Sequence, residues 1–302
     1  MMAVAGPLPG QGLRGRLRLA HRLARHTVWG IGGVAERFYE PADVADLCRF
    51  LAGLPAHEPV FWLGLGSNLL VRDGGIRGTV LHPGAALGGI ERIGERGVRA
   101  QAGAPCPKVA RFCARARLGG AEFLAGIPGT IGGALTMNAG AFGAETYGIA
   151  MRVETVSRAG ERRVRAASEF EIGYRHVGLP ADEWFLAGEF ALHADAGGGG
   201  EARIRELLAR RAQSQPIGTR NCGSVFRNPP GDHAARLIEQ CGLKGERIGG
   251  AEISRKHANF IINTGQASAA DVEALIERVM ERVERAHGVV LVPEVRIVGE
   301  RA

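Results

Sequence analysis

Residues 126–143 read GIPGTIGGALTMNAGAFG, a stretch that is rich in glycine and yet too apolar to be a linker. Its large apolar side chains need burial, and glycines among buried residues let the backbone approach a partner closely. A flat cofactor ring is one such partner, because it can be contacted by backbone donors at van der Waals distance. Tight packing of one chain segment on another would produce the same pattern. Between the two, the segment favours a cofactor site.

A second glycine turn, Gly64-Leu65-Gly66-Ser67-Asn68, follows an apolar run at residues 59–65 that predicts a buried strand. The turn begins like the dinucleotide motif G-x-G-x-x-G, but Leu69 occupies the sixth position and a strand is expected after it, not a helix. A doubly wound nucleotide fold is therefore disfavoured. Two readings stay open for this turn: a nest of backbone N–H groups that binds an anion, or a plain connection between strands.

The strands and helices expected along the chain do not alternate regularly, which indicates an α+β fold. The clearest helix spans residues 271–287, where Ser268 and Asp271 form a capping box and Gly288 ends the helix. Other elements are expected at residues 13–25 (a helix), 151–157 with 162–165 (a hairpin) and 289–298 (a strand).

The composition is that of a globular protein, with 302 residues, of which 45% are hydrophobic and 23% charged. The net charge is +7, and only Lys108, Lys244 and Lys256 among the 38 basic residues are lysines. Part of the arginine excess reflects genomic composition and carries no function. Arginine also matches phosphate and carboxylate groups with two contacts at once, so an anionic small-molecule substrate fits this charge at least as well as nucleic acid does. The basic residues alternate with glutamates and form no dense block with aromatic partners, so we expect no nucleic-acid partner.

Other features of the sequence bear on location. The chain contains no apolar run long enough to span a membrane and no secretory signal, and residues 1–12 are expected to be disordered. The five cysteines are odd in number and none are spaced as C-x-x-C, which argues against a disulfide framework and against a zinc site. We expect a cytoplasmic monomer that binds neither a metal nor a membrane.

Two residues in the segment 222–229 could carry chemistry. Ser224 follows Gly223 in a turn, where a lone serine is more often a cap or a turn hydroxyl than a catalytic group. Cys222 could act as a nucleophile, but no histidine stands nearby in the sequence to activate it. A small buried cysteine is the better interpretation.

Two charged residues elsewhere also deserve weighing. Arg175 on its own reads as a surface charge. Glu294 lies on the apolar strand expected at residues 289–298, where a buried carboxyl tends to hold its proton, as functional acids do. An ion pair with Arg296 is equally compatible with the spacing.

Seven motifs, taken in order, resemble the UDP-N-acetylenolpyruvoylglucosamine reductase family, also called UDP-N-acetylmuramate dehydrogenases. Each is weak alone, and together they are specific. The motifs are Gly64-Leu65-Gly66-Ser67-Asn68-Leu69-Leu70, Gly126-Ile127-Pro128-Gly129, Met137-Asn138-Ala139-Gly140-Ala141-Phe142-Gly143, Gly173-Tyr174-Arg175, Gly223-Ser224-Val225-Phe226-Arg227-Asn228-Pro229, Lys256-His257-Ala258-Asn259-Phe260 and Pro293-Glu294-Val295-Arg296.

The resemblance implies a non-covalent FAD held by two subdomains of the vanillyl-alcohol-oxidase type, and a third domain that closes over the substrate. The chain resembles the shorter type of the family, which lacks an insertion with a substrate-gating tyrosine. The expected divisions are residues 1–82 and 83–212 for the FAD subdomains and 213–288 for the substrate domain, with 289–302 packing back near the first. NADPH is the implied co-substrate, and the implied role is a step of peptidoglycan precursor synthesis in the cytoplasm.

The same resemblance carries over the site residues. Ser224 is the implied proton donor, and Arg175 and Glu294 are implied to hold the substrate carboxylate. The implied cofactor contacts are Gly64, Leu65, Gly66, Ser67, Asn68, Leu69, Gly103, Ile127, Pro128, Gly129, Gly132, Gly133, Asn138, Ala139 and Gly140. The implied substrate contacts are Tyr174, Arg211, Arg227 and Asn228.

Three positions depart from the family pattern. Arg227 stands where the family usually has lysine, which keeps the charge but changes its geometry. Ser214 replaces the usual lysine before Gln-Pro, so that a cationic contact is lost or is supplied by Arg210 or Arg211. His176 follows Tyr-Arg where a serine commonly stands within two residues.

Overall fold

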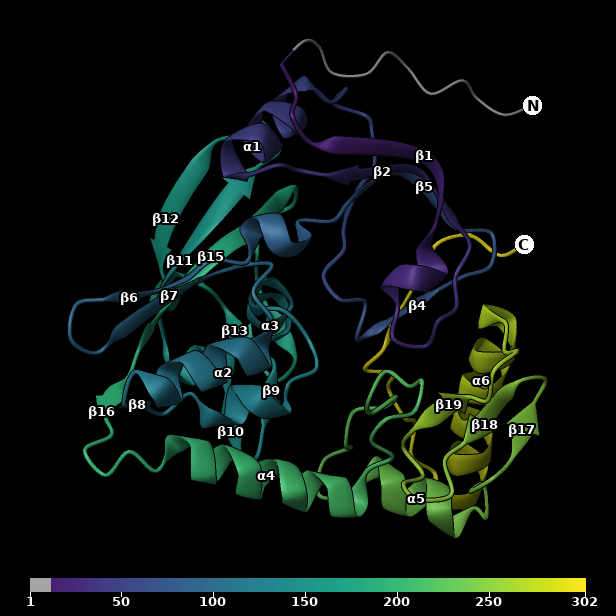
Figure 1. The fold of residues 1–302 in the computed structure, drawn as a ribbon. Coiled ribbons are helices and arrows are strands. Elements are labelled where there is room, and N and C mark those ends of the chain that lie inside the picture. Colours follow the sequence, from purple (N-terminus) through teal and green to yellow (C-terminus); the bar gives the residue numbers. More distant parts are fainter. Residues whose placement is uncertain (1–11) are drawn as a thin grey trace. The chain divides into compact units, whose positions relative to one another are not determined.

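The computed structural model describes residues 12–302, which divide into two compact units of mixed helix and strand (Figure 1). Within the described chain, unit 1 comprises residues 12–18, 37–64 and 78–204, and unit 2 comprises residues 19–36, 65–77 and 205–302. The elements that contribute residues to both are β1 (Arg16–Arg22), β2 (Val34–Glu40), β5 (Ile76–Leu81) and α4 (Gly200–Ser214). The predicted α+β class is confirmed. The disorder expected for residues 1–12 falls, apart from Gly12, outside the described residues.

Unit 1 is built on a five-stranded antiparallel sheet with the strand order β12–β11–β15–β7–β6 (Figure 1). Its strands are β6 (Ile90–Ile93), β7 (Gly97–Gln101), β11 (Ala150–Ser157), β12 (Arg162–Ala166) and β15 (Glu183–Ala191). The pairing of β11 with β12 confirms the predicted hairpin. The helices are α1 (Val44–Gly53), α2 (Cys106–Arg115) and α3 (Ile131–Met137), and α3 packs on β7 and β15.

Short elements connect these parts of unit 1. The strands are β3 (Val60–Trp62), β8 (Leu118–Gly119), β9 (Gly140–Ala141), β10 (Ala144–Glu145), β13 (Ile172–Gly173), β14 (His176–Val177) and β16 (His193–Ala194). The 3-10 turns are η2 (Gly84–Leu87), η3 (Glu122–Gly126), η4 (Thr146–Gly148) and η5 (Ala167–Glu169). β1, β2, β5 and β3 form a four-stranded sheet in that order.

Unit 2 packs a long helix on a small antiparallel sheet. Its elements are η1 (Leu23–His26), β4 (Leu69–Val71), α5 (Ala234–Gln240), β17 (Arg247–Ile248), β18 (Ala251–Ile253), β19 (Ile261–Asn263), α6 (Ala269–His287) and β20 (Arg296–Val298). One apolar face of α6, including Val272, Leu275 and Val279, is fully buried in the core of this unit. β20 pairs in parallel with β4. The three-part domain division expected from the sequence stays a prediction.

Helix α6 shows how local signals and a long-range contact combine. Ser268 Oγ accepts a hydrogen bond from the Asp271 N–H at 3.0 Å, and Asp271 Oδ2 accepts one from the Ser268 N–H at 2.9 Å, which confirms the predicted capping box. Gly288 ends the helix at φ 67°. The carboxylate of Asp73, far away in sequence, accepts from the N–H groups of Ala269 and Ala270 at the start of the same helix.

Glu273, on the buried side of α6, forms an ion pair with Arg72, whose guanidinium donates two hydrogen bonds to its carboxylate at 2.7 and 3.0 Å. This contact with Arg72, against a smaller cost of burial, lowers the pKa of Glu273 to about 2, and Arg301 adds to the effect. Because the folded protein holds this proton less tightly than the unfolded chain, the pair stabilises the fold above the ordinary carboxyl pKa. That stability is lost as the pH falls toward 2.

Replacing Glu273 with Gln should therefore lower the free energy of unfolding by about 2–3 kcal/mol at pH 7. The difference from wild type should shrink as the pH falls below about 4.5, and urea unfolding followed by circular dichroism measures it. Glu277→Gln on the same helix is the control, since that carboxylate is largely exposed and pairs with Arg301 at 3.4 Å. Equal losses in the two variants would contradict the prediction.

Two expectations about local structure are wrong. Residues 13–25 form no α-helix: β1 occupies Arg16–Arg22 and a 3-10 turn follows. The leucines there fit a helical stripe, but Leu17 and Leu19 also obey the two-residue period of a strand, and pairing with β2 selects it. In the C-terminal segment, only Arg296–Val298 of the expected strand 289–298 is strand.

The glycine-rich segment at residues 126–143 contains helix α3, which its glycine content does not predict. Thr130 caps α3 by accepting a hydrogen bond from the Gly133 N–H at 3.4 Å, and Asn138 ends the helix in the left-handed conformation. Gly132 and Gly133 weaken helix propensity, so packing of α3 on the sheet stabilises it. Among residues 12–302, no helix is long and apolar enough to cross a membrane.

Candidate functional site

In unit 2, the segment that contains Ser224 lies antiparallel to the segment that contains Glu294. The Glu294 N–H donates to the Val225 carbonyl at 2.7 Å, and the Arg227 N–H donates to the Val292 carbonyl at 2.9 Å. Backbone hydrogen bonds therefore hold Ser224 and Glu294 on neighbouring positions of one ladder, although 70 positions separate them in the chain.

Asn259 fixes the Ser224 segment from the other side. It is buried, and its backbone carbonyl accepts from the Val225 N–H at 2.9 Å. Its side chain accepts from the Phe226 N–H and donates to the Phe226 carbonyl, each at 2.9 Å. Asn259 belongs to the motif at residues 256–260, from which the sequence predicted no role for it. A buried Asn whose amide forms backbone hydrogen bonds on both sides is a positioning residue for the ladder.

Ser224 is not a helix cap, and its hydroxyl is not hydrogen-bonded to any described residue of its turn. Helix α5 starts at Ala234, ten positions on, and its N-cap is His233. Gly223 has φ 84°, so its backbone favours glycine, and its N–H donates to the Asn221 side chain at 2.9 Å. Within residues 12–302 no hydrogen bond engages the Ser224 hydroxyl, which leaves it available to a ligand.

The glycine turn at 64–68 meets the same ladder through Asn68. Its side-chain amide donates to the Glu294 carbonyl at 3.0 Å, and its own carbonyl accepts from the Arg296 N–H at 3.1 Å. Gly66 has φ 60°, and a Cβ there would lie 2.1 Å from the His26 carbonyl oxygen, so only glycine fits. Three segments with predicted site residues are thus joined within unit 2.

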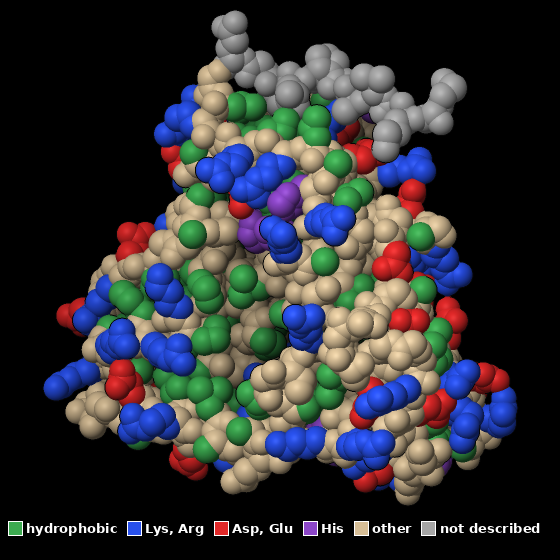
Figure 2. Space-filling model, turned by 45° about the vertical axis from the view of Figure 1, so that its right-hand side comes forward, with side chains coloured by type: hydrophobic (Ala, Val, Ile, Leu, Met, Phe, Trp, Pro, Cys, Tyr) green, Lys and Arg blue, Asp and Glu red, His purple; other side chains and the backbone are tan. Residues whose placement is uncertain are grey.

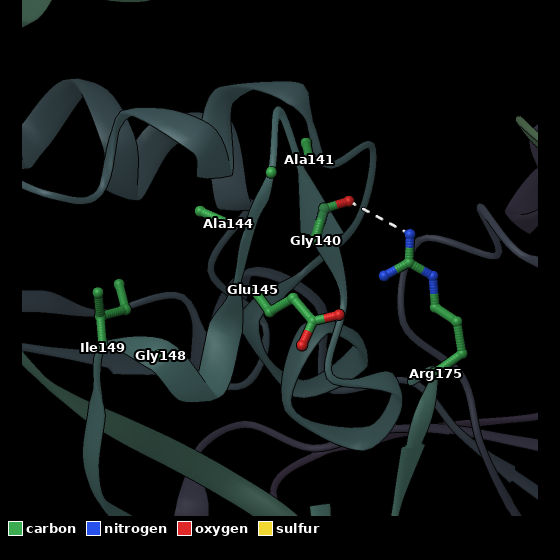
Figure 3. A pocket seen from close by; sticks show the side chains of 8 residues that line it. Gly140, Ala141, Ala144, Glu145, Gly148, Ile149 and Arg175 are labelled. Carbon is green, nitrogen blue, oxygen red and sulfur yellow. Dashed lines mark hydrogen bonds between the residues drawn. The ribbon is translucent and has the colours of Figure 1, made fainter. Parts of the chain in front are cut away.

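In unit 1, Arg175 lines a cavity of about 580 Å³ (Figure 3). The other lining residues are Gly140, Ala141, Gly143, Ala144, Glu145, Gly148 and Ile149. Its guanidinium donates to the carbonyls of Asn138 and Gly140, each at 3.4 Å, and lies 5.0 Å from the centre of the Tyr174 ring. Arg175 is therefore held in a pocket, and the reading of an isolated surface charge does not describe it.

Two predicted cofactor segments come together at Thr130, also in unit 1. A Cβ on Gly64 would lie 3.0 Å from Thr130 Oγ1, and one on Gly133 would lie 3.9 Å from the same atom. Gly133 is exposed, and no other described atom would lie within 4 Å of that Cβ. An open glycine surface beside a hydroxyl fits the face of a flat cofactor. Thr130 was missed by sequence reasoning, although a threonine before an apolar helix is a common N-cap signal.

Other glycines of the predicted cofactor set are needed by the protein itself. A Cβ on Gly132 would lie 2.9 Å from the Cβ of Ala102, and one on Gly103 would lie 2.1 Å from the Gly84 carbonyl oxygen. The N–H of Gly132 donates to the Ala102 carbonyl at 2.9 Å. Tight packing therefore explains these two glycines, and their contact with a cofactor stays a prediction.

The five cysteines are free thiols. Cys222 is buried, and the loss of solvation raises the pKa of its thiol, with a smaller contribution from the charge of Glu294. A thiol with a raised pKa is a poor nucleophile at neutral pH. The interpretation of Cys222 as a small buried residue is confirmed.

The predicted substrate contacts in unit 2 have different surroundings. Burial lowers the pKa of Arg211, whose Nε donates to the Gln215 side chain at 2.6 Å. Among the described residues, the buried Nε of Arg227 has no hydrogen-bond partner. Asn228 Oδ1 accepts from the Ala234 N–H at the start of α5. Lys256 donates to the Ala212 carbonyl at 2.6 Å, so a lysine from another segment approaches the position where Ser214 departs from the family pattern.

Two known protein families match this chain, one in its N-terminal half and one in its C-terminal third. Residues 35–164 match the family described as FAD binding domain, and residues 215–298 match the family described as UDP-N-acetylenolpyruvoylglucosamine reductase, C-terminal domain.

Proteins named UDP-N-acetylenolpyruvoylglucosamine reductase are similar over nearly the whole length. The one from Methylococcus capsulatus is 60% identical over 92% of this chain and 91% of its own. The one from Alkalilimnicola ehrlichii is 58% identical over 95% and 96%. The crystal structure of the reductase from Thermus caldophilus superposes with a TM-score of 0.80 at 34% identity, covering 94% of this chain and 98% of that one.

Proposed function

Because this chain belongs to the UDP-N-acetylenolpyruvoylglucosamine reductase family and is an FAD-dependent oxidoreductase, we propose that it reduces UDP-N-acetylglucosamine enolpyruvate to UDP-N-acetylmuramate with NADPH. The observation that supports this most is the ladder in unit 2, which holds Ser224 beside Glu294 and joins both to the Gly64–Asn68 turn through Asn68. FAD, when bound, would supply the hydride chemistry that links NADPH to the terminal carbon of the enolpyruvyl double bond.

Arg175 and Glu294 are proposed to act on the negative charge that hydride transfer creates on the substrate. Its arrival leaves an electron pair on the neighbouring carbon, which delocalises into the substrate carboxylate. Arg175 stabilises this charge through its guanidinium, and Glu294 is the second residue that we propose holds the substrate carboxylate. Donors placed where charge develops contribute strongly, and loss of one typically costs about 10²–10³ in rate.

Ser224 completes the reduction by giving its hydroxyl proton to that carbon. A serine hydroxyl is a weak acid, whereas efficient general acids titrate near the working pH. The enolate carbon is a strong base, so a weak acid held in place by the ladder suffices, and water restores its proton. One hydride and one proton are then added across the double bond, and the NADPH that gave the hydride has left as NADP⁺ in the first half-reaction.

The remaining site residues hold the two ligands. We assign FAD to the glycine segments, from Gly64 to Leu69 and from Ile127 to Gly140, where Gly133 offers an open surface beside Thr130. Arg211 and Arg227 suit the diphosphate, because guanidinium groups bind phosphate in two contacts, and Tyr174 and Asn228 complete the substrate contacts. A cytoplasmic monomer is proposed, consistent with five unpaired thiols.

Two other functions make different predictions. A flavin oxidase of the same fold acting on an alcohol or sugar would have reduced flavin that reacts quickly with oxygen, and would not need Ser224. A nucleic-acid-binding protein would be colourless and would retain DNA at low salt. Figure 2 shows basic side chains scattered over the face in view with uncharged and acidic surface between them, which does not favour the second alternative.

A spectroscopic experiment separates these functions. The purified protein should be yellow, and under anaerobic conditions NADPH should bleach the flavin absorbance. Addition of the enolpyruvyl UDP-sugar should restore the absorbance with formation of one product per flavin reoxidised, and the UDP-sugar without the enolpyruvyl group is the control. A protein that cannot be reconstituted with flavin, or whose reduced flavin ignores the substrate, would rule out the proposal.

A further inference from the structure

The end of helix α3 carries a buried asparagine in a conformation that few residues adopt. Asn138 has φ 40° and ψ 50°, in the left-handed region, and its side chain is 2% exposed. Asparagine tolerates this region better than other residues with a side chain, and only glycine enters it without strain. Burial of a polar amide costs free energy unless its hydrogen bonds are formed, so the Asn138 amide is expected to have partners within the protein.

The side-chain amide of Asn138 forms its hydrogen bonds within the protein. Its Nδ2 donates to Glu145 Oε2 at 2.8 Å and to the Gly173 carbonyl at 3.3 Å, and its Oδ1 accepts from the Tyr147 N–H at 3.1 Å. Both N–H groups are therefore used. The side chain fastens the end of α3 to residues 145–147 and to Gly173, which lies two positions before Arg175.

The backbone of the same turn faces Arg175. The carbonyls of Asn138 and Gly140 accept from its two terminal nitrogens, while the Ala139 carbonyl between them accepts from the N–H of Thr146 at 3.0 Å and from its hydroxyl at 2.7 Å. Alternate carbonyls thus point at Arg175 and at Thr146. Figure 3 shows the guanidinium reaching toward the Gly140 carbonyl.

Arg175 depends on such support because its own backbone is unfavourable. It has φ 55° in the two-residue turn between β13 and β14, where Gly173 pairs with His176. Non-glycine residues in this region persist when the surroundings hold them. At 3.4 Å each, the two hydrogen bonds from the guanidinium are weak, so they orient the group and leave it able to bind an anion.

From this arrangement we propose that Asn138, anchored by Glu145, is a positioning residue that sets the orientation of Arg175 toward the substrate carboxylate, and is not itself a side-chain ligand of FAD. The inference rests on the proposed function, because it assigns Arg175 to the half-reaction in which the enolpyruvyl substrate is reduced. It predicts that the Asn138 side chain acts on that half-reaction and only through Arg175.

The test uses Asn138→Gly in the full-length flavoprotein. Glycine keeps the left-handed backbone and removes only the side-chain hydrogen bonds. Stopped-flow absorbance should show flavin reduction by NADPH at the wild-type rate and reoxidation by the enolpyruvyl substrate about 10- to 100-fold slower, the range expected when a group is displaced by about 1 Å. Ser157→Ala is the matched control, since it removes one hydrogen bond, from the Glu161 N–H to the Ser157 hydroxyl, in the β11–β12 hairpin of the same unit.

A double-mutant cycle distinguishes positioning from a general structural role. In an Arg175→Ala background, Asn138→Gly should change the reoxidation rate by less than about threefold, because its route of action is already gone. Glu145→Ala and Glu145→Gln give a second test if Asn138→Gly does not fold. Glutamine retains an oxygen that accepts from Asn138 and should restore most of the rate that alanine loses.

Several results would overturn the inference while leaving the proposed function intact. One is a wild-type reoxidation rate in Asn138→Gly, and another is equal slowing of both half-reactions in that variant. A third is a double variant in which the rate losses of Asn138→Gly and Arg175→Ala multiply in full. The last is an equal reoxidation rate in the two Glu145 variants. A wild-type enzyme whose reduced flavin ignores the enolpyruvyl substrate would instead refute the function itself.

Discussion

Replacing Ser224 with Ala is expected to slow flavin reoxidation by the enolpyruvyl substrate by about 10²–10⁴-fold, the usual contribution of a positioned general acid. Flavin reduction by NADPH should keep its wild-type rate, because the role proposed for Ser224 belongs only to the second half-reaction. Anaerobic stopped-flow measurement of each half-reaction checks both statements. The ladder should survive the change, since it is held by the backbone groups of Val225 and Arg227 and by Asn259.

Ser224→Cys sharpens this experiment. A thiol is more acidic than a hydroxyl and occupies the same place, so it should retain part of the activity that alanine loses. Ser168→Ala, an exposed serine of unit 1, is the control and should behave as wild type. If the alanine variant turned over at nearly the wild-type rate, Ser224 would not be the proton donor.

Replacing Arg175 with Ala should lower the rate of substrate reduction by about 10²–10³-fold, with a larger effect on kcat than on KM, because the charge it stabilises develops in the transition state. Lysine at this position keeps the charge but cannot use the fork that donates to the Asn138 and Gly140 carbonyls. It should therefore recover only part of the rate. Steady-state kinetics on flavin-loaded protein measures the separation.

Arg152 supplies the control for this experiment. It is exposed on β11 of the same unit, pairs with Glu189 at 2.7 Å and does not line the Arg175 cavity, so Arg152→Ala removes one positive charge outside that cavity. Surface pairs of this kind contribute little. A loss in Arg152→Ala as large as that in Arg175→Ala, or a change in Arg175→Ala confined to KM, would argue against the stabilising role.

Elements with complete local signals were predictable. Helix α6 has an apolar stripe, a capping box at Ser268 and a glycine stop at Gly288, all within its own segment, and the structure has each of them. The hairpin of β11 and β12 follows from alternation over two short runs. Helix α3 and strand β1 were missed because their local signals are weak or ambiguous, and packing on other strands decides them.

The residues that connect distant segments of the chain were the hardest to predict from the sequence. Thr130, Asn259 and Asp73 form hydrogen bonds or contacts with segments far from them in the chain, and nothing in their immediate sequence names those partners. The cofactor contact expected of Asn138 stays a prediction, and the hydrogen bonds of its amide to Glu145 and Tyr147 were not foreseen. Side-chain chemistry can be read from the sequence, but a hydrogen bond depends on where two distant segments meet.

By itself, the sequence determined the α+β class and the family, and it predicted Ser224, Arg175 and Glu294 as catalytic residues, because ordered motifs and side-chain types are local information. Only the tertiary structure decided that Ser224 and Glu294 share one ladder, and that the turn at residues 138–140 faces Arg175. The physical reason is that backbone hydrogen bonds and burial arise between segments brought together by folding. In the same way, glycines 103 and 132 of the predicted cofactor set are required by contacts within the protein.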